Sequence, residues 1–359
     1  MKTQFDICVL PGDGIGVEVI EATLPILEKL QLGAGFEFRF KHHRAGAQHF
    51  KASGEALPEA TFAAAKAADA ILFGAMGWPE IRYPDGTEIA PQLDLRVELD
   101  LYAGVRPARA LPGIALPLAD PRARRIDLVV VRESTEGLFA SRGKGVIDND
   151  AEARDTMVIT RRGSERVHDF AFRLAQRRKT RGSAGRVTCV DKANVFLSMA
   201  FFRKIFDERA AAFPGIEARH NYIDATALDM IRKPWDYDVM VTENMFGDIL
   251  SDLTAGLVGG MGMAPSADVG DHHGLFQPCH GSAPDIAGQG KANPVATILS
   301  AAMMLDWLAE RSGHDALAAA ARRIEEAVDR VFAAQAVTPF EFGGKDGTAA
   351  IIAAVVAEL

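Results

Sequence analysis

The stretch YDVMVTENMFGDILSDL, residues 237–253, joins one apolar run to a second that carries two aspartates. Its first part is typical of a buried strand, and its second part, from Asn244 onward, is typical of a helix. Asp248 and Asp252 stand four residues apart, so a helix places their carboxylates on one face, roughly 5–6 Å from each other. Such a like-charged pair destabilises a helix. Either both carboxylates face water, or a positive charge neutralises them.

The charges around this stretch favour neutralisation. Between Pro234 and Gly290 the sequence contains no Lys and no Arg. The same span carries eight acidic residues: Asp236, Asp238, Glu243, Asp248, Asp252, Asp268, Asp271 and Asp285. The neutralising charge must therefore come from another segment of the chain, from a second chain or from a bound cation.

The order of strand and then helix recurs along the chain. Apolar runs predict strands within residues 5–14, 69–77, 126–134, 186–194 and 237–245. Helical patterns lie between or after them, within 16–30, 56–68, 164–179, 197–213 and 292–310. This alternation predicts an α/β protein. The sequence has no repeat and no long linker, so a second domain would form where the chain leaves one sheet and later returns to it.

Composition narrows the class of protein. The 359 residues are 48% hydrophobic and 25% charged, which suits two globular domains or one large domain. A net charge of −8 argues against a nucleic-acid-binding or membrane-surface protein. Cys8, Cys189 and Cys279 are widely spaced, which is typical of a reduced compartment. The N-terminal segment does not resemble a signal peptide, and no apolar run is long enough to cross a membrane. We expect a soluble, cytoplasmic protein.

A glycine-rich turn follows the first predicted strand. LPGDGIGVEV, residues 10–19, resembles a dinucleotide-binding fingerprint because it ends a strand and begins a helix. The fingerprint that starts at Gly12 needs a third glycine where this chain has Val17. We therefore interpret these glycines as a tight turn between a strand and a helix.

Cationic side chains stand at the ends of several predicted elements. Arg96, Arg106 and Arg132 could each bind a carboxylate through two hydrogen bonds, although a surface salt bridge is the commoner role of such residues. Lys192 ends the strand of RVTCVDKAN, where burial can lower the pKa of a lysine enough for proton transfer.

Taken together, the motifs resemble one family, the β-decarboxylating dehydrogenases that act on isopropylmalate, isocitrate, homoisocitrate, tartrate and D-malate. The resemblance is carried by LPGDGIGVEV, by Arg96 and Arg106 before Pro107, and by VRESTEGLF, VDKANV, YIDATA, TENMFGDILSDL and HGSAPDIAGQGKANP. These segments follow one another in the family's order over nearly the whole chain. Their shared order makes the match far more specific than any one motif.

The resemblance implies a role for each polar residue. Asp224, Asp248 and Asp252 would bind Mg²⁺ or Mn²⁺, which take oxygen ligands. Lys192 and Asp224 would relay the proton of the substrate's C2 hydroxyl. Three arginines would bind the carboxylates of a malate-type hydroxy-dicarboxylate: Arg96, Arg106 and Arg132.

The resemblance also implies an architecture. The fold would comprise two α/β domains with the active site in the cleft between them. A discontinuous cofactor-side domain would span residues 1–101 and 258–359, and residues 102–257 would form the domain for substrate, metal and dimerisation. Lys192 and Asp224 would reach into the partner subunit's site, so a homodimer is expected.

The segment HGSAPDIAGQGKANP would bind the cofactor. Asp285 stands where the family's NAD-dependent members place an aspartate against the ribose hydroxyls, and Ile286 stands where NADP-dependent members have a tyrosine. A carboxylate accepts hydrogen bonds from a 2′-hydroxyl and repels a 2′-phosphate, so NAD is predicted. The cofactor-binding residues would be His280, Gly281, Ser282, Ala283, Pro284, Asp285, Ile286 and Asn293.

Two positions leave alternatives open. Phe139 replaces the family's catalytic tyrosine and has no proton to donate, which leaves open a catalytically impaired, regulatory homologue. The segment TEIAPQLDLR, residues 87–96, offers a mildly apolar wall to the substituent on C3. A 3-isopropylmalate-like or D-malate/tartrate-like acid is therefore favoured, with an isocitrate- or homoisocitrate-type enzyme as the alternative.

Overall fold

A computed structural model describes residues 2–359, which form two compact units. Unit 1 comprises residues 1–100, 111–115 and 258–359, and unit 2 comprises residues 101–110 and 116–257. Each unit is described by itself below. In both units helices pack against a largely parallel sheet, so the predicted α/β class is confirmed.

The sheet of unit 1 has the strand order β2, β1, β3, β12, β11. β1 pairs in parallel with β2 and β3, β3 pairs in parallel with β12, and only the β11–β12 pair among these strands is antiparallel. The central strand β3 is buried along its whole length, as expected for a strand covered on both faces. The strand bounds are β1 Gln4–Gly12, β2 Glu37–His42, β3 Ala70–Ala75, β11 Pro265–Val269 and β12 Gly274–Pro278.

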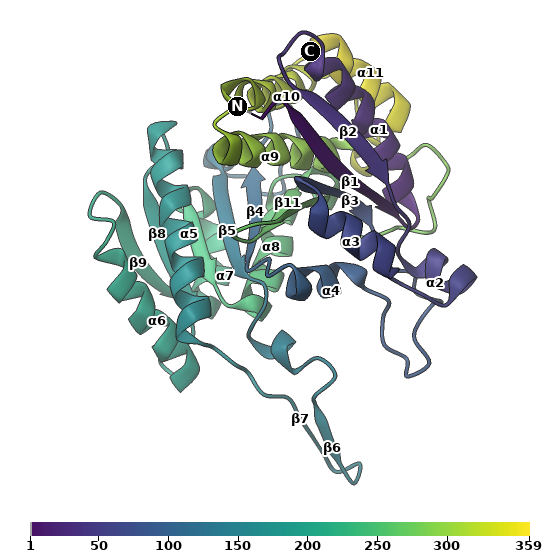
Figure 1. The fold of residues 1–359 in the computed structure, drawn as a ribbon. Coiled ribbons are helices and arrows are strands. Elements are labelled where there is room, and N and C mark those ends of the chain that lie inside the picture. The colour runs from purple at the N-terminus through teal and green to yellow at the C-terminus, as the bar shows by residue number, and fades with distance from the viewer. Residues whose placement is uncertain (1) are drawn as a thin grey trace. The chain divides into compact units, whose positions relative to one another are not determined.

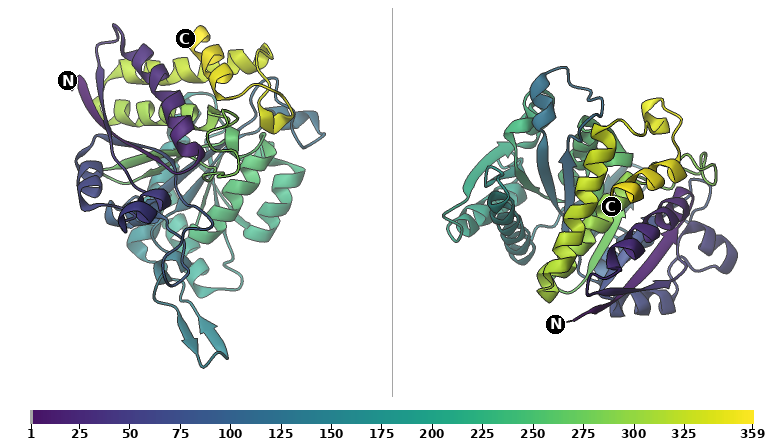
Figure 2. Two further views of the ribbon diagram at one scale, coloured as in Figure 1. Left: turned by 90° about the vertical axis from the view of Figure 1, so that its right-hand side faces the viewer. Right: turned by 90° about the horizontal axis from the view of Figure 1, so that it is seen from above.

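Helices of unit 1 form layers on this sheet (Figures 1 and 2). α1 packs on β1 and β3, α9 packs on β11 and β12, and α10 and α11 lie outside them. The helix bounds are α1 Ile15–Gln31, α2 Ala47–Ser53, α3 Glu59–Ala67, α4 Pro91–Glu98, α9 Val295–Ser312, α10 Asp315–Ala333 and α11 Thr348–Glu358. The glycine turn between β1 and α1 is tight: Gly14 has φ of 56° and a side chain there would collide with the carbonyl oxygen of Ser282.

Unit 2 has a sheet of order β4, β5, β10, β8, β9, parallel except for the β4–β5 pair. α5 and α6 pack on one side, and α8 packs on β4, β5 and β10 while α7 packs on β8, β9 and α8. The strand bounds are β4 Ala103–Arg109, β5 Asp127–Glu133, β8 Arg186–Asp191, β9 Glu217–Tyr222 and β10 Val239–Thr242. The helix bounds are α5 Arg161–Thr180, α6 Leu197–Ala210, α7 Ile223–Arg232 and α8 Asn244–Leu257.

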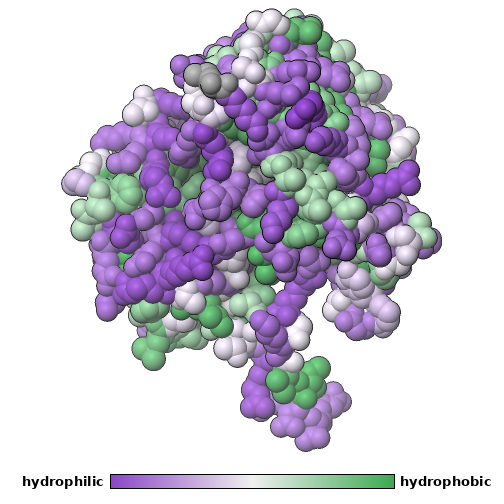
Figure 3. Space-filling model, in the orientation of Figure 1, coloured by the Kyte–Doolittle hydropathy of each residue, from purple (hydrophilic) through white to green (hydrophobic). Residues whose placement is uncertain are grey.

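A hairpin of β6 (Val146–Asp148) and β7 (Glu152–Arg154) projects from unit 2 (Figures 1 and 2). Val146 and Ile147 are exposed on it, and Figure 3 shows hydrophobic atoms at this projection. Short 3₁₀ helices cover Pro121–Arg125, Leu138–Ser141, Pro234–Asp236, Met261–Met263 and Phe340–Phe342. Among the described residues, no helix combines the length and apolar character needed to cross a membrane.

One segment differs from the predicted division of the chain. Leu111–Ala115 packs with unit 1, although the predicted range 102–257 assigns it to the second domain. Leu111 and Ile114 are buried, and Gly113, with φ of 77°, approaches the carbonyl oxygen of Phe332 too closely for any side chain. A short loop with two buried apolar anchors has no periodicity, so the sequence pattern could not reveal this excursion.

Candidate active site

The N-terminus of α8 is fixed by a buried carboxylate. Glu243 follows β10, is 2% exposed, and accepts hydrogen bonds from the backbone N–H groups of Met245 (3.0 Å) and Phe246 (2.7 Å). This is the bonding of a helix cap, and it satisfies two N–H groups that have no partner within the helix. Burial raises the pKa of Glu243, while the two backbone bonds oppose that rise.

Asp248 and Asp252 lie one turn apart on α8, as predicted, and both are exposed. Arg132, from β5, forms an ion pair with Asp248 through Nη1. The pKa of Asp252 is raised by partial burial and by the charge of Asp248, and the positive charges of Arg106 and Arg132 oppose this rise. Arginines of the neighbouring strands therefore supply part of the neutralising charge, and the charge of Asp248 still disfavours ionisation of Asp252.

The two arginines of unit 2 are placed by the register of β4 and β5. Gly104 lies opposite Arg132 and Arg106 lies opposite Val130, so both arginine side chains leave the same face of the sheet. Both residues are buried, at 5% exposure for Arg106 and 3% for Arg132. Two cationic groups thus leave one sheet face beside a carboxylate pair. Such an arrangement can bind an anion at the arginines together with a cation at the aspartates.

Asn244 orients Arg132. Its Oδ1 accepts a hydrogen bond from Arg132 Nε at 2.8 Å, and its Nδ2 donates to the carbonyl oxygen of Glu136 at 3.0 Å. Sequence reasoning did not identify Asn244 or Glu243 as site residues. For Glu243 a signal was present, because a polar residue directly before a helix is a candidate for capping.

Phe139 lies beside this cluster. Its ring centroid is 5.0 Å from the guanidinium carbon of Arg132, within the range of a cation–π contact. Phe139 belongs to the 3₁₀ helix Leu138–Ser141 that follows β5. The structure thus places the aromatic ring at the site, and the ring carries no hydroxyl.

Lys192 and Asp224 form a second polar group of unit 2. Lys192 Nζ is 2.8 Å from Asp224 Oδ1, and this hydrogen-bonded ion pair lowers the pKa of Asp224. The ring centroid of Tyr222 is 5.8 Å from Lys192 Nζ, so the lysine also has an aromatic neighbour that sequence reasoning missed.

The predicted metal ligands do not all converge within one chain. Among residues 2–359, no group of three His, Cys, Asp or Glu side chains could hold a metal ion. Asp224 is engaged by Lys192, while Asp248 and Asp252 share a face of α8. One chain therefore presents two half-sites, a carboxylate pair and a lysine–aspartate pair.

Arg96 belongs to unit 1, in the last turn of α4. It is 7% exposed, and its Nε donates to Asp268 Oδ2 on β11 at 3.0 Å. Burial with a carboxylate partner distinguishes Arg96 from an ordinary surface arginine.

The predicted cofactor segment also lies in unit 1, wrapped around the start of α1. The carbonyl oxygen of Ser282 accepts a hydrogen bond from Ile15 N at 2.8 Å. Ala283, Ile286 and Ala287 pack against a buried cluster of Ile15, Val19 and Ala292. Ala283 has φ of 35°, a conformation that costs energy for a residue with a side chain.

Polar atoms in this segment differ in availability. His280 Nδ1 is 2.9 Å from the carbonyl oxygen of Gly281, and His280 Nε2 is buried without a hydrogen-bond partner. Burial lowers the pKa of His280, which favours the neutral imidazole. The side chain of Asn293 is already used: its Nδ2 donates to Glu341, and its Oδ1 accepts from Val295 N at 3.1 Å. Asp285 is exposed.

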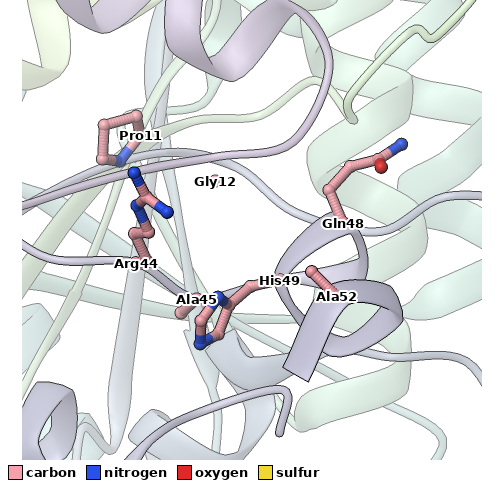
Figure 4. A pocket seen from close by; sticks show the side chains of 7 residues that line it. All are labelled: Pro11, Gly12, Arg44, Ala45, Gln48, His49 and Ala52. Carbon is pink, nitrogen blue, oxygen red and sulfur yellow. The ribbon is translucent and has the colours of Figure 1, made fainter. Parts of the chain in front are cut away.

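A cavity of about 250 Å³ lies elsewhere in unit 1, between the end of β1 and α2 (Figure 4). Arg44 extends beside Pro11, the His49 ring lies beside Ala45, and Gln48 points away. The buried carboxylate of Asp13 fixes α2 next to it by accepting hydrogen bonds from Ala47 N at 2.7 Å and from Gln48 N at 2.8 Å. None of the predicted site residues lines this cavity.

Comparisons with known proteins identify the family. The chain is 46% identical to a 3-isopropylmalate/3-methylmalate dehydrogenase from Methanocaldococcus jannaschii, with 95% of both chains covered. It is 42% identical to a 3-isopropylmalate dehydrogenase from Moorella thermoacetica, with 94% of this chain and 93% of that protein covered.

Solved structures similar to this chain are also dehydrogenases of this kind. Isocitrate dehydrogenase from Methylococcus capsulatus is similar with a TM-score of 0.85 and 36% identity, covering 99% of both chains. A β-decarboxylating dehydrogenase from Thermococcus kodakarensis is similar with a TM-score of 0.77 and 36% identity, covering 99% of this chain and 96% of that one. The family model described as isocitrate/isopropylmalate dehydrogenase matches residues 6–355. The chain belongs to the isocitrate/isopropylmalate dehydrogenase family and is a decarboxylating dehydrogenase.

Proposed function

We propose that this enzyme oxidatively decarboxylates a malate-type 2-hydroxy acid with NAD and a divalent cation, Mg²⁺ or Mn²⁺. The observation that carries the proposal is the cluster on α8 and its neighbouring strands, where Arg106 and Arg132 face Asp248 and Asp252. Arginines suit the two carboxylates of the acid, and the aspartates suit a hard cation that binds its hydroxyl.

The preferred substrate is a malate with a small or apolar substituent on C3, as in 3-isopropylmalate or 3-methylmalate. Leu93 and Gln92 of α4 are partly buried and would be the residues available to this substituent, whereas Ile89 is fully buried in a cluster with Ala47 and Ala56. The segment 87–96 brings no cation other than Arg96 for a third carboxylate, which disfavours isocitrate and homoisocitrate. The names of the similar proteins from Methanocaldococcus jannaschii and Moorella thermoacetica support the same choice.

The carboxylates of α8 fit a divalent cation. A cation would relieve the mutual repulsion that raises the pKa of Asp252, and Asp224 of the partner subunit would complete an oxygen-donor set. When bound, the cation polarises the oxygen on C2, which stabilises the charge that develops as CO₂ leaves. Arg106 and Arg132 would hold the substrate's carboxylates. Lys192, after passing a proton to Asp224, would take the hydroxyl proton as hydride leaves C2 for NAD.

The cofactor segment fits NAD. His280 offers the buried, unpaired Nε2 as a hydrogen-bonding atom, and Asp285 offers an exposed carboxylate to ribose hydroxyls. The internal bonds of Asn293 leave its backbone, rather than its amide, as the group that would face the cofactor.

A homodimer would bring the two half-sites together. Several large apolar side chains of unit 2 are exposed in the single chain, most of all Leu197 at 90%. Such a set is typical of an interface between subunits. The others include Val146, Ile147, Val195, Phe196, Leu228, Ile231 and Ile249. We place this homodimer in the cytoplasm, on the evidence of three free cysteines.

A substrate panel tests the proposal. NADH formation is measured with 3-isopropylmalate, 3-methylmalate, D-malate, tartrate and isocitrate, in the presence of Mn²⁺ and again after EDTA. We expect turnover of a 3-alkylmalate or D-malate that EDTA abolishes and Mn²⁺ restores, and that Asp252→Asn removes. Turnover that survives EDTA would contradict the metal's role. Thermal stabilisation by these acids without any NADH formation would instead favour the hypothesis, suggested by Phe139, of a catalytically impaired, regulatory homologue.

A further inference from the structure

Asp268 is a buried carboxylate with no role in the proposed chemistry. It lies in β11, is 0% exposed, and its Oδ2 accepts the hydrogen bond from Arg96 Nε at 3.0 Å. The side chain of Arg96 is itself buried, at 9% exposure. A buried ion pair is a weak source of stability, because removing both charges from water offsets most of their attraction. Its presence calls for another explanation.

A second donor fixes the orientation of Asp268. Gln277 Nε2, on β12, donates to the same Oδ2 at 2.9 Å. In the antiparallel β11–β12 pair, Ser266 lies opposite Gln277 and Asp268 lies opposite Leu275, so Gln277 and Asp268 share a face of the sheet as diagonal neighbours. Oδ2 therefore receives two donors from two different elements and cannot turn without losing both.

The geometry determines how Arg96 is presented. A guanidinium is planar, so holding Nε fixes the plane and the direction of its two terminal nitrogens. Among residues 2–359, neither Nη1 nor Nη2 of Arg96 has a hydrogen-bond partner. The side chain is thus anchored at Nε. Its two terminal nitrogens, called the Arg96 fork below, remain available to a ligand.

We propose that Asp268 is a positioning residue, which holds the Arg96 fork in the plane that binds a carboxylate of the substrate in two contacts. This inference rests on the proposed function, because Arg96 must bind substrate for its orientation to matter. The alternative is that the pair merely fastens α4 to the sheet, in which case its loss would reduce stability and leave substrate binding unchanged.

Asp268→Asn tests the inference, because it preserves shape and replaces the charged acceptor of Arg96 Nε and Gln277 Nε2 by a weaker, neutral amide oxygen. We expect KM for the hydroxy acid to rise at least about tenfold, since a displaced binding group can cost as much as ~100-fold. We expect kcat to change less than about threefold and KM for NAD to stay unchanged, the pattern of a lost binding contact. Asp268→Ala, which removes both hydrogen bonds, should raise KM at least as far; if it does not fold, Asp268→Asn alone decides.

Asp238→Asn is the matched control. Asp238 is also buried, at 2% exposure, and accepts from an arginine Nε, that of Arg178, at 2.7 Å. It directly precedes β10, whereas Asp248 and Asp252 lie in α8, which follows the other end of that strand. We expect its substitution to lower the midpoint of thermal unfolding, as Asp268→Asn does, without altering KM.

Variants that already carry Arg96→Gln distinguish a positioning role of Asp268 from a purely structural one. Adding Asp268→Asn to Arg96→Gln should leave KM for the hydroxy acid unchanged, because no guanidinium remains to be oriented. An Asp268→Asn variant with normal KM, or one that raises KM equally in both backgrounds, would overturn the inference. If the wild type forms no NADH with any acid, the proposed function fails. The role of Asp268 is then tested by D-malate binding, measured as the concentration that gives half-maximal thermal stabilisation. Equal concentrations for wild type and Asp268→Asn would overturn the inference.

Discussion

At the scale of single residues, Phe139 stands where the family resemblance leads us to expect a tyrosine. Its ring contacts Arg132 and has no proton to donate. Phe139→Tyr should accelerate protonation of the carbon left by decarboxylation, because a positioned general acid is worth ~10²–10⁴-fold on its own step. The gain in kcat should be smaller where domain opening or NADH release limits turnover.

Single-turnover measurements of hydride transfer and of the formation of the protonated 2-keto acid check this prediction. In the wild type we expect hydride transfer to outpace keto-acid formation, and in Phe139→Tyr we expect the lag to shorten. If keto-acid formation already keeps pace in the wild type, and the variant leaves it unchanged, then water or another group donates the proton and the phenylalanine is neutral.

Glu133, next to Arg132, predicts a pH dependence of stability. It is 3% exposed, and burial raises its pKa from 4.5 to about 7, against hydrogen bonds from Thr135 and Glu136 that favour the charged form. The folded state therefore holds a proton that the unfolded state releases between about pH 4.5 and 7. Its stabilising contribution is fully present below about pH 4.5 and is lost as the pH rises through about 7.

Glu133→Gln removes this titration. The free energy of unfolding of the variant, relative to wild type, should increase by roughly 1–3 kcal/mol between pH 5 and pH 8. Urea unfolding at both pH values measures it. A difference between the two proteins that does not change with pH would mean that Glu133 is ionised, or protonated, throughout this range.

The sequence revealed site residues whose chemistry is unusual for their place in an element. Asp248 and Asp252 stand out because one helical face repeats a charge, and Lys192 because it ends an apolar strand. Asn244 and Asp268 could not be selected in this way. Their importance comes from contacts with Arg132 and Arg96, 112 and 172 residues away in sequence, which only the folded chain brings together.

At the scale of elements, strands with continuous apolar runs could be predicted from the sequence, and polar strands at the edges could not. The five predicted strands correspond to β1, β3, β5, β8 and β10, whose buried residues make continuous apolar runs. β2 and β9 end the strand order and are largely exposed. β9 is polar without alternation, and β2 alternates only briefly, with Phe38 and Phe40 between charged residues. Their pairing is set by the neighbouring strand, and composition gives little sign of it.

The cofactor segment gives the prediction at this scale. Replacing Asp285 by Lys and Ile286 by Tyr should shift kcat/KM towards NADP, because an ammonium attracts the 2′-phosphate that a carboxylate repels. We expect a change in the NAD-to-NADP ratio of at least about tenfold, which corresponds to ~1.4 kcal/mol. Asp285→Asn is the control, and it should weaken NAD binding without improving NADP. Preference for NADP in the unaltered enzyme would contradict the assignment of this segment.

At the scale of the whole molecule, the two polar groups of unit 2 pose a question that one chain cannot answer. Under the proposed function, Asp248 and Asp252 would need a third metal ligand and Lys192 with Asp224 would need a substrate. No three acidic, Cys or His side chains among residues 2–359 form a metal site. The exposed apolar side chains of unit 2, among them Ile147, Leu197 and Ile249, provide a surface on which a second copy could bind. Two-fold symmetry would then complete both sites at once.

Heterodimers of two inactive variants test this sharing. Lys192→Met and Asp252→Asn, co-expressed with different tags and purified through both, give dimers with one copy of each. If a site takes Asp252 from one subunit and Lys192 from the other, one site holds both substitutions and the second holds neither. The heterodimer should then recover about half the activity of the wild-type dimer, whereas each variant homodimer stays inactive.

The matched control combines two residues of the same half-site. In a heterodimer of Lys192→Met with Asp224→Asn, each site receives Lys192 and Asp224 from a single subunit, so every site keeps one defect. Recovery with Asp252→Asn but not with Asp224→Asn therefore establishes which residues cross the interface, and does so independently of the substrate's identity. If all three residues acted within one chain, neither heterodimer would recover activity, because each site would carry its own subunit's substitution. Equal recovery in both would instead place Lys192 and Asp224 in different sites, which their 2.8 Å ion pair argues against.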